Sequence, residues 1–177
     1  MMNLKIERFH IAVKYGRFEN SIGQYGLKIS DEISRSINGS LNLGIAQEVG
    51  GKIILERDIR TAQSDLEMEA TIATVLFERK VGIELACYLL EEAGLKPASI
   101  FDLAAFGRYF LEKAGKISQY GLSEPEMVGA GNIYWYDRRR HPLDIEKSFP
   151  VLVLNEKRIR LSRVDYRWEF FLAVPIE

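Results

Sequence analysis

The segment from residue 132 to residue 142, N-I-Y-W-Y-D-R-R-R-H-P, combines the side chains that proteins use to bind nucleic acid. Aromatic rings stack on bases, and arginine guanidinium groups bind phosphate through a planar fork of donors. Residues of the same types recur between residues 158 and 168. If the strands that carry these two segments lie side by side, they form a stacking surface with phosphate contacts at its rim. The residues predicted to bind nucleic acid are Tyr134, Tyr136, Arg138, Arg139, Arg140, Arg158, Arg160 and Trp168.

A purely structural role for these residues is the alternative interpretation. Residues 132 to 177 contain nine basic and seven acidic side chains, so the excess of positive charge is small. Tyrosine and tryptophan are common in sheets, and the arginines have Asp137, Asp144 and Glu146 nearby as partners for ion pairs. The segment could therefore be the solvated end of a strand.

Two glutamates in the middle of the chain suggest a different chemistry. Glu67 and Glu69 lie on one face if their segment is a strand, and with a further carboxylate they could hold a divalent metal. Basic residues on a neighbouring strand, Arg57 and Arg60 or Lys52, would then bind a phosphate. The pair resembles part of the lining of the triphosphate tunnel enzymes, which implies a metal-dependent phosphohydrolase. The Glu-x-Glu-x-Lys signature of that family is missing, because the first strand reads K-I-E-R-F-H, so no catalytic residue is transferred.

Other catalytic chemistries find little support in the sequence. The chain has no G-x-S-x-G, two histidines and one cysteine, Cys87, which lies in an apolar run and is expected in the core. A lone cysteine excludes a structural zinc site built on thiolates, and no dinucleotide or P-loop fingerprint is present. We therefore expect no cofactor and no metal. The sequence favours a non-enzymatic binding protein for RNA or DNA; an assembly or inhibitor module, of viral or mobile-element origin, that binds a protein partner or itself is the second interpretation.

Composition indicates one folded domain spanning residues 1 to 177. With 177 residues, of which 47% are hydrophobic, the chain is long enough to bury a core, and its formal net charge of −1 provides no global attraction to nucleic acid or membranes. Charged residues interrupt the amino terminus, and no apolar run reaches the length of a membrane span. These features predict a cytoplasmic protein that does not associate with membranes.

The periodicity of the amino half predicts strands. Residues 4 to 15 alternate, with Phe9, Ile11, Val13 and Tyr15 on one face and His10 on the other. A three-strand meander is predicted from about residue 27 to residue 59, with a hairpin turn at residues 38 to 40 that sets Ile33 opposite Ile45, and a second turn at Gly50-Gly51.

The remaining elements complete an α+β arrangement. Residues 66 to 77 read as a strand, although Ser64 and Glu67 would also form a helical capping box. Two helices are expected at about 80–93, ended by Gly94, and at 99–114, capped by Ser99. A glycine-rich loop at 115–132 is the candidate sub-boundary. It is followed by four predicted strands, N-I-Y-W-Y, P-V-L-V-L-N, R-I-R-L-S-R-V and Y-R-W-E-F-F-L-A-V, with a turn at Asn155 and Glu156 between the second and the third.

Overall fold

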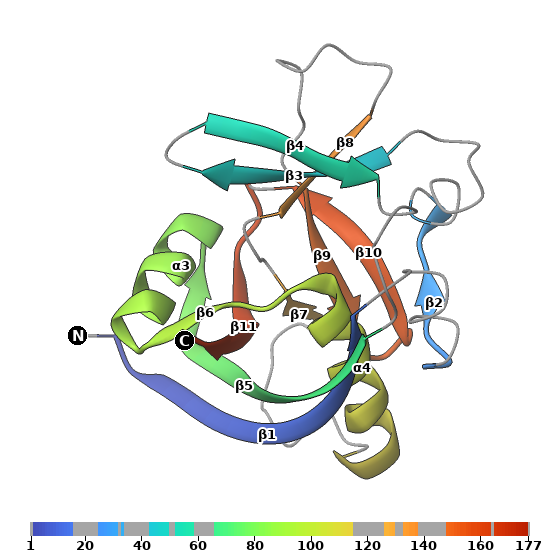
Figure 1. The fold of residues 1–177 in the computed structure, drawn as a ribbon. Helices are drawn as coiled ribbons and strands as arrows, with labels where there is room; N and C mark the ends of the chain where they lie inside the picture. The colour runs from blue at the N-terminus through green and yellow to red at the C-terminus, as the bar shows by residue number, and fades with distance from the viewer. Residues whose placement is uncertain are drawn as a thin grey trace.

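Two long strands, β1 (Leu4–Tyr15) and β5 (Leu66–Val81), form a curved antiparallel ribbon along one side of the molecule (Figure 1). The computed structural model describes residues 2–15, 25–31, 33, 43–49, 52–58, 66–114, 126–129, 133–137, 148–163 and 165–176. The two strands pair without interruption from Leu4 opposite Phe77 to Tyr15 opposite Leu66. The strand prediction for residues 66 to 77 is confirmed, and the strand continues four residues further.

The ribbon is one side of a mixed sheet of eight strands among the described residues. The order is β1-β5-β11-β7-β9-β10-β2, and β6 pairs with β11 as well. The bounds are β2 Lys28–Ile29, β6 Leu95–Pro97, β7 Glu126–Val128, β9 Ser148–Val153, β10 Arg158–Arg163 and β11 Trp168–Pro175. A second sheet has the order β4 (Lys52–Asp58), β3 (Leu43–Val49), β8 (Ile133–Asp137).

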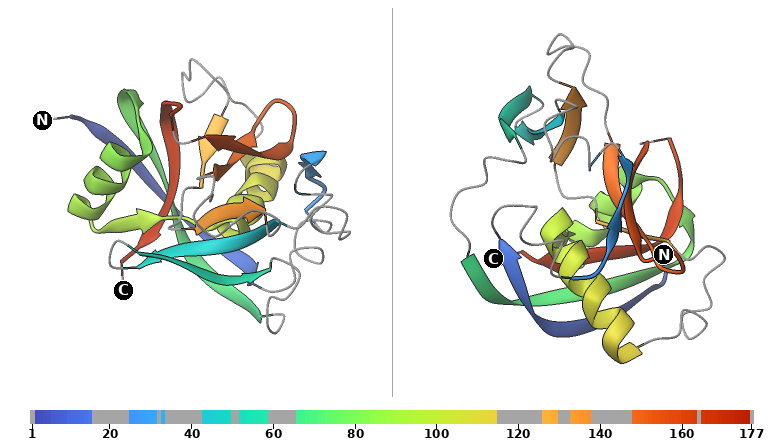
Figure 2. Two further views of the ribbon diagram at one scale, coloured as in Figure 1. Left: turned by 90° about the horizontal axis from the view of Figure 1, so that it is seen from above. Right: turned by 90° about the vertical axis from the view of Figure 1, so that its right-hand side faces the viewer.

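Two helices pack on opposite faces of the larger sheet. Neighbouring residues of β11 alternate between two buried clusters: Phe170 and Leu172 join the cluster that contains helix α4 (Ile100–Tyr109), and Phe171 joins the cluster that contains helix α3 (Ile83–Glu92). Helix α4 crosses the β1–β5 ribbon (Figure 2), where Phe9 meets Phe106 at a centroid distance of 5.4 Å. A strand buried on both faces needs a continuous apolar sequence, which explains the run F-F-L-A-V in β11.

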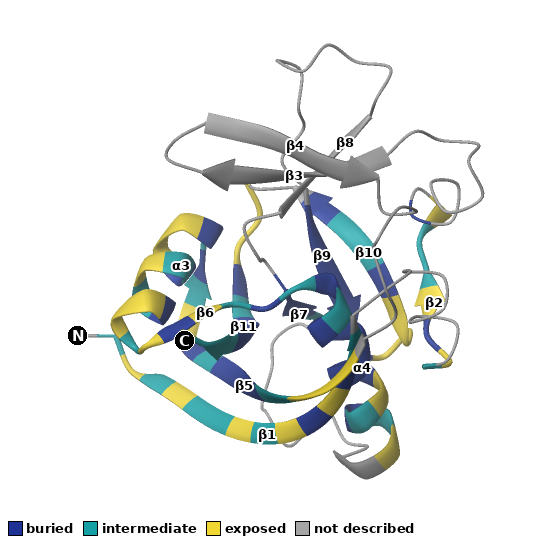
Figure 3. Cartoon of the chain, in the orientation of Figure 1, coloured by how far each residue is buried: buried dark blue, intermediate teal, exposed yellow. Residues whose placement is uncertain are grey.

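The burial pattern of β1 shows where the ribbon is uncovered. Ile11 and Val13 are buried under α4, whereas His10 and the other even-numbered residues from 8 to 12 are exposed (Figure 3). The predicted outward orientation of His10 is therefore confirmed. None of the helices in the described part of the chain is long and apolar enough to span a membrane.

The ends of the helices follow local rules that the sequence predicted. Ser99 caps α4 in a capping box: the Asp102 N–H donates to Ser99 Oγ at 3.3 Å, and the Ser99 N–H donates to the Asp102 carboxylate at 2.8 Å. Gly94 follows α3 with a φ of 72°, which favours glycine. Helix α4 continues as a π-helical turn, Phe110–Ala114, so both predicted helices and the α+β class are confirmed.

The prediction for residues 27 to 37 is wrong in its details. Strand β2 has two residues and pairs in parallel with β10, and Asp31 and Ile33 have helical backbone. Ile33 is fully buried in the cluster under α4, so it does not face Ile45 on β3. Isoleucines four residues apart fit a helix as well as a strand, and long-range packing decided between them. The proposed turn at residues 38 to 40 lies outside the described residues.

The pairing of β3 with β4 and the turn after β9 agree with their predictions. β3 pairs with β4 in the antiparallel direction up to Val49 opposite Lys52, and the predicted turn residues Gly50 and Gly51 lie outside the described residues. Residues 154 to 157 form a turn, with Lys157 at a φ of 52°. The predicted loop at 115–132 contains a strand, β7, that the sequence analysis missed, because three residues between two neighbouring strands carry almost no local signal. Residues 115–125 and 130–132 of that predicted loop lie outside the described ranges.

Replacement of the α4 cap tests this local account. Ser99→Ala removes the hydroxyl that accepts the Asp102 N–H, so we expect the free energy of unfolding to fall by about 1 kcal/mol. Ser99→Thr keeps a hydroxyl and is the matched control, with most of that loss avoided. Urea denaturation of both variants measures the difference; equal losses would show that the cap does not stabilise the helix.

Candidate functional site

The predicted nucleic-acid-binding residues are divided between two sheets. Tyr134 and Tyr136 lie on β8, where their backbones pair with Ala46 and Gly44 of β3. Arg158 and Arg160 lie on β10, and Trp168 begins β11, both in the larger sheet. The three consecutive arginines, Arg138, Arg139 and Arg140, lie outside the described residues.

Glu126 connects two of the predicted residues and was not anticipated from the sequence. One carboxylate oxygen of Glu126 accepts a hydrogen bond from Arg160 Nη2 at 2.5 Å, and the other accepts one from Trp168 Nε1 at 3.0 Å. The Trp168 side chain is buried, with 3% of the residue exposed, so its ring has no open face on which a base could stack. Arg160 and Trp168 are thus neighbours, as a stacking surface would require, but both donate to the half-buried Glu126 carboxylate.

The hollow beside this cluster has a mixed charge. It has a volume of about 360 Å³ and is lined by Ser30, Asp31, Glu126, Val153, Glu156, Arg158, Arg160 and Leu161. Three carboxylates therefore face two guanidinium groups, and Arg158 Nε lies 3.9 Å from Glu156. A phosphate would meet a local excess of negative charge here, which makes this hollow a poor anion site.

An irregularity in β5 creates a second, different surface. Trp168 of β11 pairs with Val81, whereas Phe170, two residues later, pairs with Leu76, so four residues of β5, numbers 77 to 80, oppose the single residue Glu169. A bulge of this kind bends the strand and turns side chains to new directions, and such bulges are over-represented beside functional sites. Two of the bulge residues that leave the regular ladder are basic, Arg79 and Lys80.

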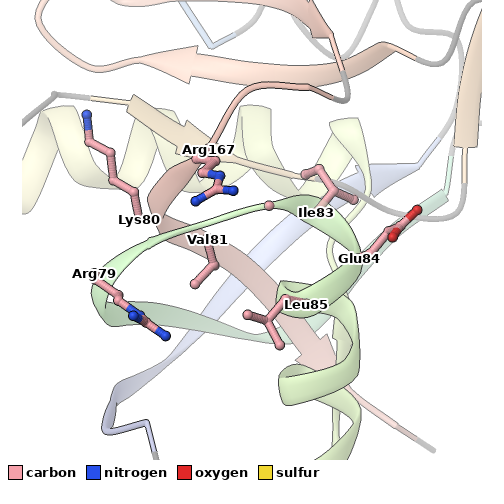
Figure 4. Close-up of a pocket in the computed structure, with 8 residues that line it drawn as sticks. Arg79, Lys80, Val81, Ile83, Glu84, Leu85 and Arg167 are labelled. Carbon is pink, nitrogen blue, oxygen red and sulfur yellow. The ribbon is translucent and has the colours of Figure 1, made fainter.

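The bulge, the turn before β11 and the start of α3 surround a hollow that we call the basic pocket. Its volume is about 550 Å³, and it is lined by Arg79, Lys80, Val81, Gly82, Ile83, Glu84, Leu85 and Arg167. Figure 4 shows Arg79 and Lys80 on opposite sides of the β5 ribbon, with Arg167 reaching the pocket from a separate segment. Arg167 lies there because its neighbour Trp168 pairs with Val81.

Three positive groups and one negative group therefore line the basic pocket. Arg79 and Arg167 are exposed, Lys80 is half-buried, and Glu84 is exposed in the first turn of α3. The N-cap of that helix is Gly82, which provides no side-chain hydrogen bond to the first turn. A helix start of this type adds a weak positive potential to that of the basic side chains. The signal in the sequence was the order E-R-K-V-G directly before an apolar helix.

The carboxylate pair proposed for a phosphohydrolase lies near the first residue of β5, where its side chains are exposed. Glu67 and Glu69 are both exposed, and Glu67 Oε2 lies 3.5 Å from Lys14 Nζ. The strands next to β5 are β1 and β11, while β4, which carries Lys52 and Arg57, belongs to the other sheet. The expectation that Lys52 and Arg57 lie on a strand next to β5 is therefore wrong, and Arg60 lies outside the described residues. Among the described residues no group of three potential metal ligands comes together.

Cys87 has the environment of a packing residue. It is half-buried on α3 beside the cluster formed by that helix and the sheet. Burial raises the pKa of the Cys87 thiol, and the negative charge of Glu84 raises this pKa further, against the opposite effect of a backbone hydrogen bond. The neutral thiol is therefore favoured, which is the opposite of what a nucleophile needs.

Alkylation of Cys87 provides a direct check, because it is the single cysteine of the chain. At pH 8 iodoacetamide should react several-fold more slowly with the folded protein than with the urea-unfolded protein, since a raised pKa lowers the thiolate fraction. The rate in the folded protein should still rise steeply above the usual thiol pKa. Equal rates for folded and unfolded protein at pH 8 would contradict the assignment.

Comparisons of the chain with protein-family models, with curated proteins and with solved structures give no match. The function must therefore be inferred from the geometry and charge of the described residues.

Proposed function

We propose that the protein is a non-enzymatic nucleic-acid-binding protein whose basic pocket contacts the phosphate backbone. The observation that carries the proposal is that Arg79 and Lys80 line one hollow together with Arg167, which comes from a segment far away in the sequence. Guanidinium groups bind phosphate oxygens through paired donors, and phosphate contacts supply most of the affinity of non-specific nucleic-acid binding. Because the chain has a net charge of −1, it can attract the phosphate groups of a nucleic acid only through a local cluster of positive side chains.

An exposed aromatic residue next to Arg167 in the sequence supports nucleic acid over a small anion as the ligand. Tyr166 precedes Arg167 in the turn before β11 and is 58% exposed. Its ring lies 6.1 Å from the ring of Trp168, centroid to centroid, at an interplanar angle of 41°. One side of the Tyr166 ring thus has an internal neighbour while much of the residue remains accessible. An exposed ring next to phosphate-binding groups is the combination that single-stranded nucleic acid recognises through stacking.

The segment with three arginines extends the same proposal. The sequence predicts a surface made of Tyr134, Tyr136, Arg138, Arg139 and Arg140, and the arginines of this surface would add phosphate contacts to those of the basic pocket. A cytoplasmic location belongs to the proposal as well, because a lone cysteine suits a reducing compartment.

Removal of the three positive charges of the pocket tests the proposal. In Arg79→Ala/Lys80→Ala/Arg167→Ala we expect the affinity for a fluorescent single-stranded oligonucleotide to fall about tenfold or more. The slope of log affinity against log salt should also become shallower, by about 0.7 for every phosphate that the variant no longer binds. Fluorescence anisotropy over about 50 to 200 mM salt measures both quantities.

The matched control removes the same charge from other elements. Arg8, Lys28 and Lys96 are exposed on β1, β2 and β6, and their triple change to alanine should leave the affinity close to that of the wild type. If both triple variants lost the same affinity for the oligonucleotide, the net charge of the protein would explain the loss, and the proposed site at the pocket would be wrong. Arg138→Ala/Arg139→Ala/Arg140→Ala, measured in parallel, gives the contribution of the second surface.

A protein partner is the second candidate, favoured by apolar side chains on α3. Leu85 and Tyr88 are 44% and 59% exposed and lie one turn apart on the helix, next to the basic pocket. Exposed tyrosine, leucine and arginine together are typical of protein interfaces. Light scattering of the purified protein separates the candidates: a mass well above 20.3 kDa that persists in high salt, without oligonucleotide binding, would favour self-assembly.

A further inference from the structure

The turn that carries Arg167 and Tyr166 depends on how Trp168 is held. Trp168 is the first residue of β11 and pairs with Val81, beyond the bulge in β5. The continuous pairing of β11 with β5 begins at Phe170. Glu169, which lies between Phe170 and Trp168, is at the irregularity in this pairing. The side chain of Trp168 is packed in the cluster shared with α3, so this packing holds the turn in place together with the pairing of Trp168 with Val81.

Glu126 holds the Trp168 side chain by accepting a hydrogen bond from the indole N–H, which is the only polar hydrogen of that side chain. The indole Nε1 donates to one Glu126 oxygen at 3.0 Å, and Arg160 donates to the other oxygen. The Glu126 side chain is 18% exposed and that of Arg160 is 35% exposed, so the carboxylate is shielded and its charge has a partner. Glu126 is itself fixed in place, because β7 pairs with β9 from Glu126 opposite Val153 to Val128 opposite Val151.

We infer that Glu126 is a positioning residue for the basic pocket, acting through Trp168 on Arg167 and Tyr166. This inference depends on the proposed function of the pocket. A binding group that is already held in its bound position loses less conformational entropy when the ligand arrives, so a rigid turn raises the affinity without any contact from Glu126 to the ligand. Loss of the acceptor would also leave a buried indole N–H without a partner, which favours rearrangement of the turn.

Electrostatics and positioning predict opposite effects when Glu126 loses its charge. A carboxylate repels a phosphate, so its neutralisation would by charge alone strengthen the binding of an oligonucleotide. The positioning role predicts weaker binding instead. Glu126→Gln is the suitable variant, because its single carbonyl oxygen cannot accept from both donors. The charged guanidinium of Arg160 is the stronger donor for that oxygen, which leaves the indole N–H of Trp168 facing the amide N–H groups.

The experiment compares Glu126→Gln with Glu156→Gln, which removes an exposed carboxylate from the turn between β9 and β10. We expect the affinity of Glu126→Gln for a single-stranded oligonucleotide to fall several-fold with its salt slope unchanged, whereas Glu156→Gln binds as tightly as the wild type or slightly more tightly. Arg167→Ala should lose affinity and also flatten the salt slope, because the variant binds one phosphate fewer.

Amide hydrogen exchange gives a readout that needs no ligand. Exchange in the peptide that contains residues 165 to 167 should be faster in Glu126→Gln and unchanged in Glu156→Gln, because the turn opens more often when Trp168 is not held. Trp168→Phe, which keeps an aromatic ring and the Glu126–Arg160 pair and removes the indole donor, should give the same increase. This second variant tests the idea if Glu126→Gln does not fold.

The outcomes separate the two proposals. If Arg167→Ala weakens binding while Glu126→Gln and Trp168→Phe fold and bind as the wild type does, the positioning role is wrong and the basic pocket stands. If the wild type binds no oligonucleotide, the proposed function is wrong. Faster exchange in both Glu126→Gln and Trp168→Phe would then show that Glu126 stabilises the turn without a role in ligand binding. Unchanged exchange in both variants would overturn the positioning role in every case.

Discussion

The antiparallel pairing of β11 with β5 is the interaction on which the rest of the structure depends. β11 is buried on both faces, with Phe170 and Leu172 on the side of α4 and Phe171 and Ala173 on the side of α3. Its second edge pairs with β6 and β7, so its backbone groups find partners on both sides. This one strand therefore joins the long ribbon, both helices and the β7–β9–β10 part of the sheet.

The same pairing explains where the positive charge lies. In the regular part of the ladder both faces of β5 and β11 are covered, and an arginine or lysine there would lose its hydration without a partner. The charges of Arg79 and Lys80 occur at the bulge, where the ladder is interrupted. Because the buried part of the sheet excludes charged side chains, the positive charges of β5 lie at the end of the ribbon, next to the turn that contains Arg167.

Residues of the same types have different roles on the two sides of Trp168. Arg160 and the buried indole of Trp168 donate to the half-buried Glu126 carboxylate, and an indole N–H buried without such an acceptor would cost about 1 to 3 kcal/mol. Tyr166 and Arg167, within two residues of Trp168, are exposed. An arginine and an aromatic ring close together in sequence therefore do not identify a ligand surface; the environment of each side chain decides.

The sequence by itself determined the features that depend on neighbours along the chain. The alternation of residues 4 to 15 and 66 to 77, the cap at Ser99 and the stop at Gly94 predicted elements that the structure contains, because these signals arise within a few residues. The α+β class followed from their order. Only the tertiary structure decided which strands pair and which charged groups meet. The two-residue strand at Lys28–Ile29 and the three-residue strand at Glu126–Val128 exist because β10, β9 and β11 offer them backbone partners, and such short segments have no periodicity of their own. The placement of Arg79 and Arg167 around one pocket, and the contact of Glu126 with Trp168, likewise depend on register across the sheet. Register is fixed by burial of the two faces over the whole sheet, and no local pattern in the sequence contains that information.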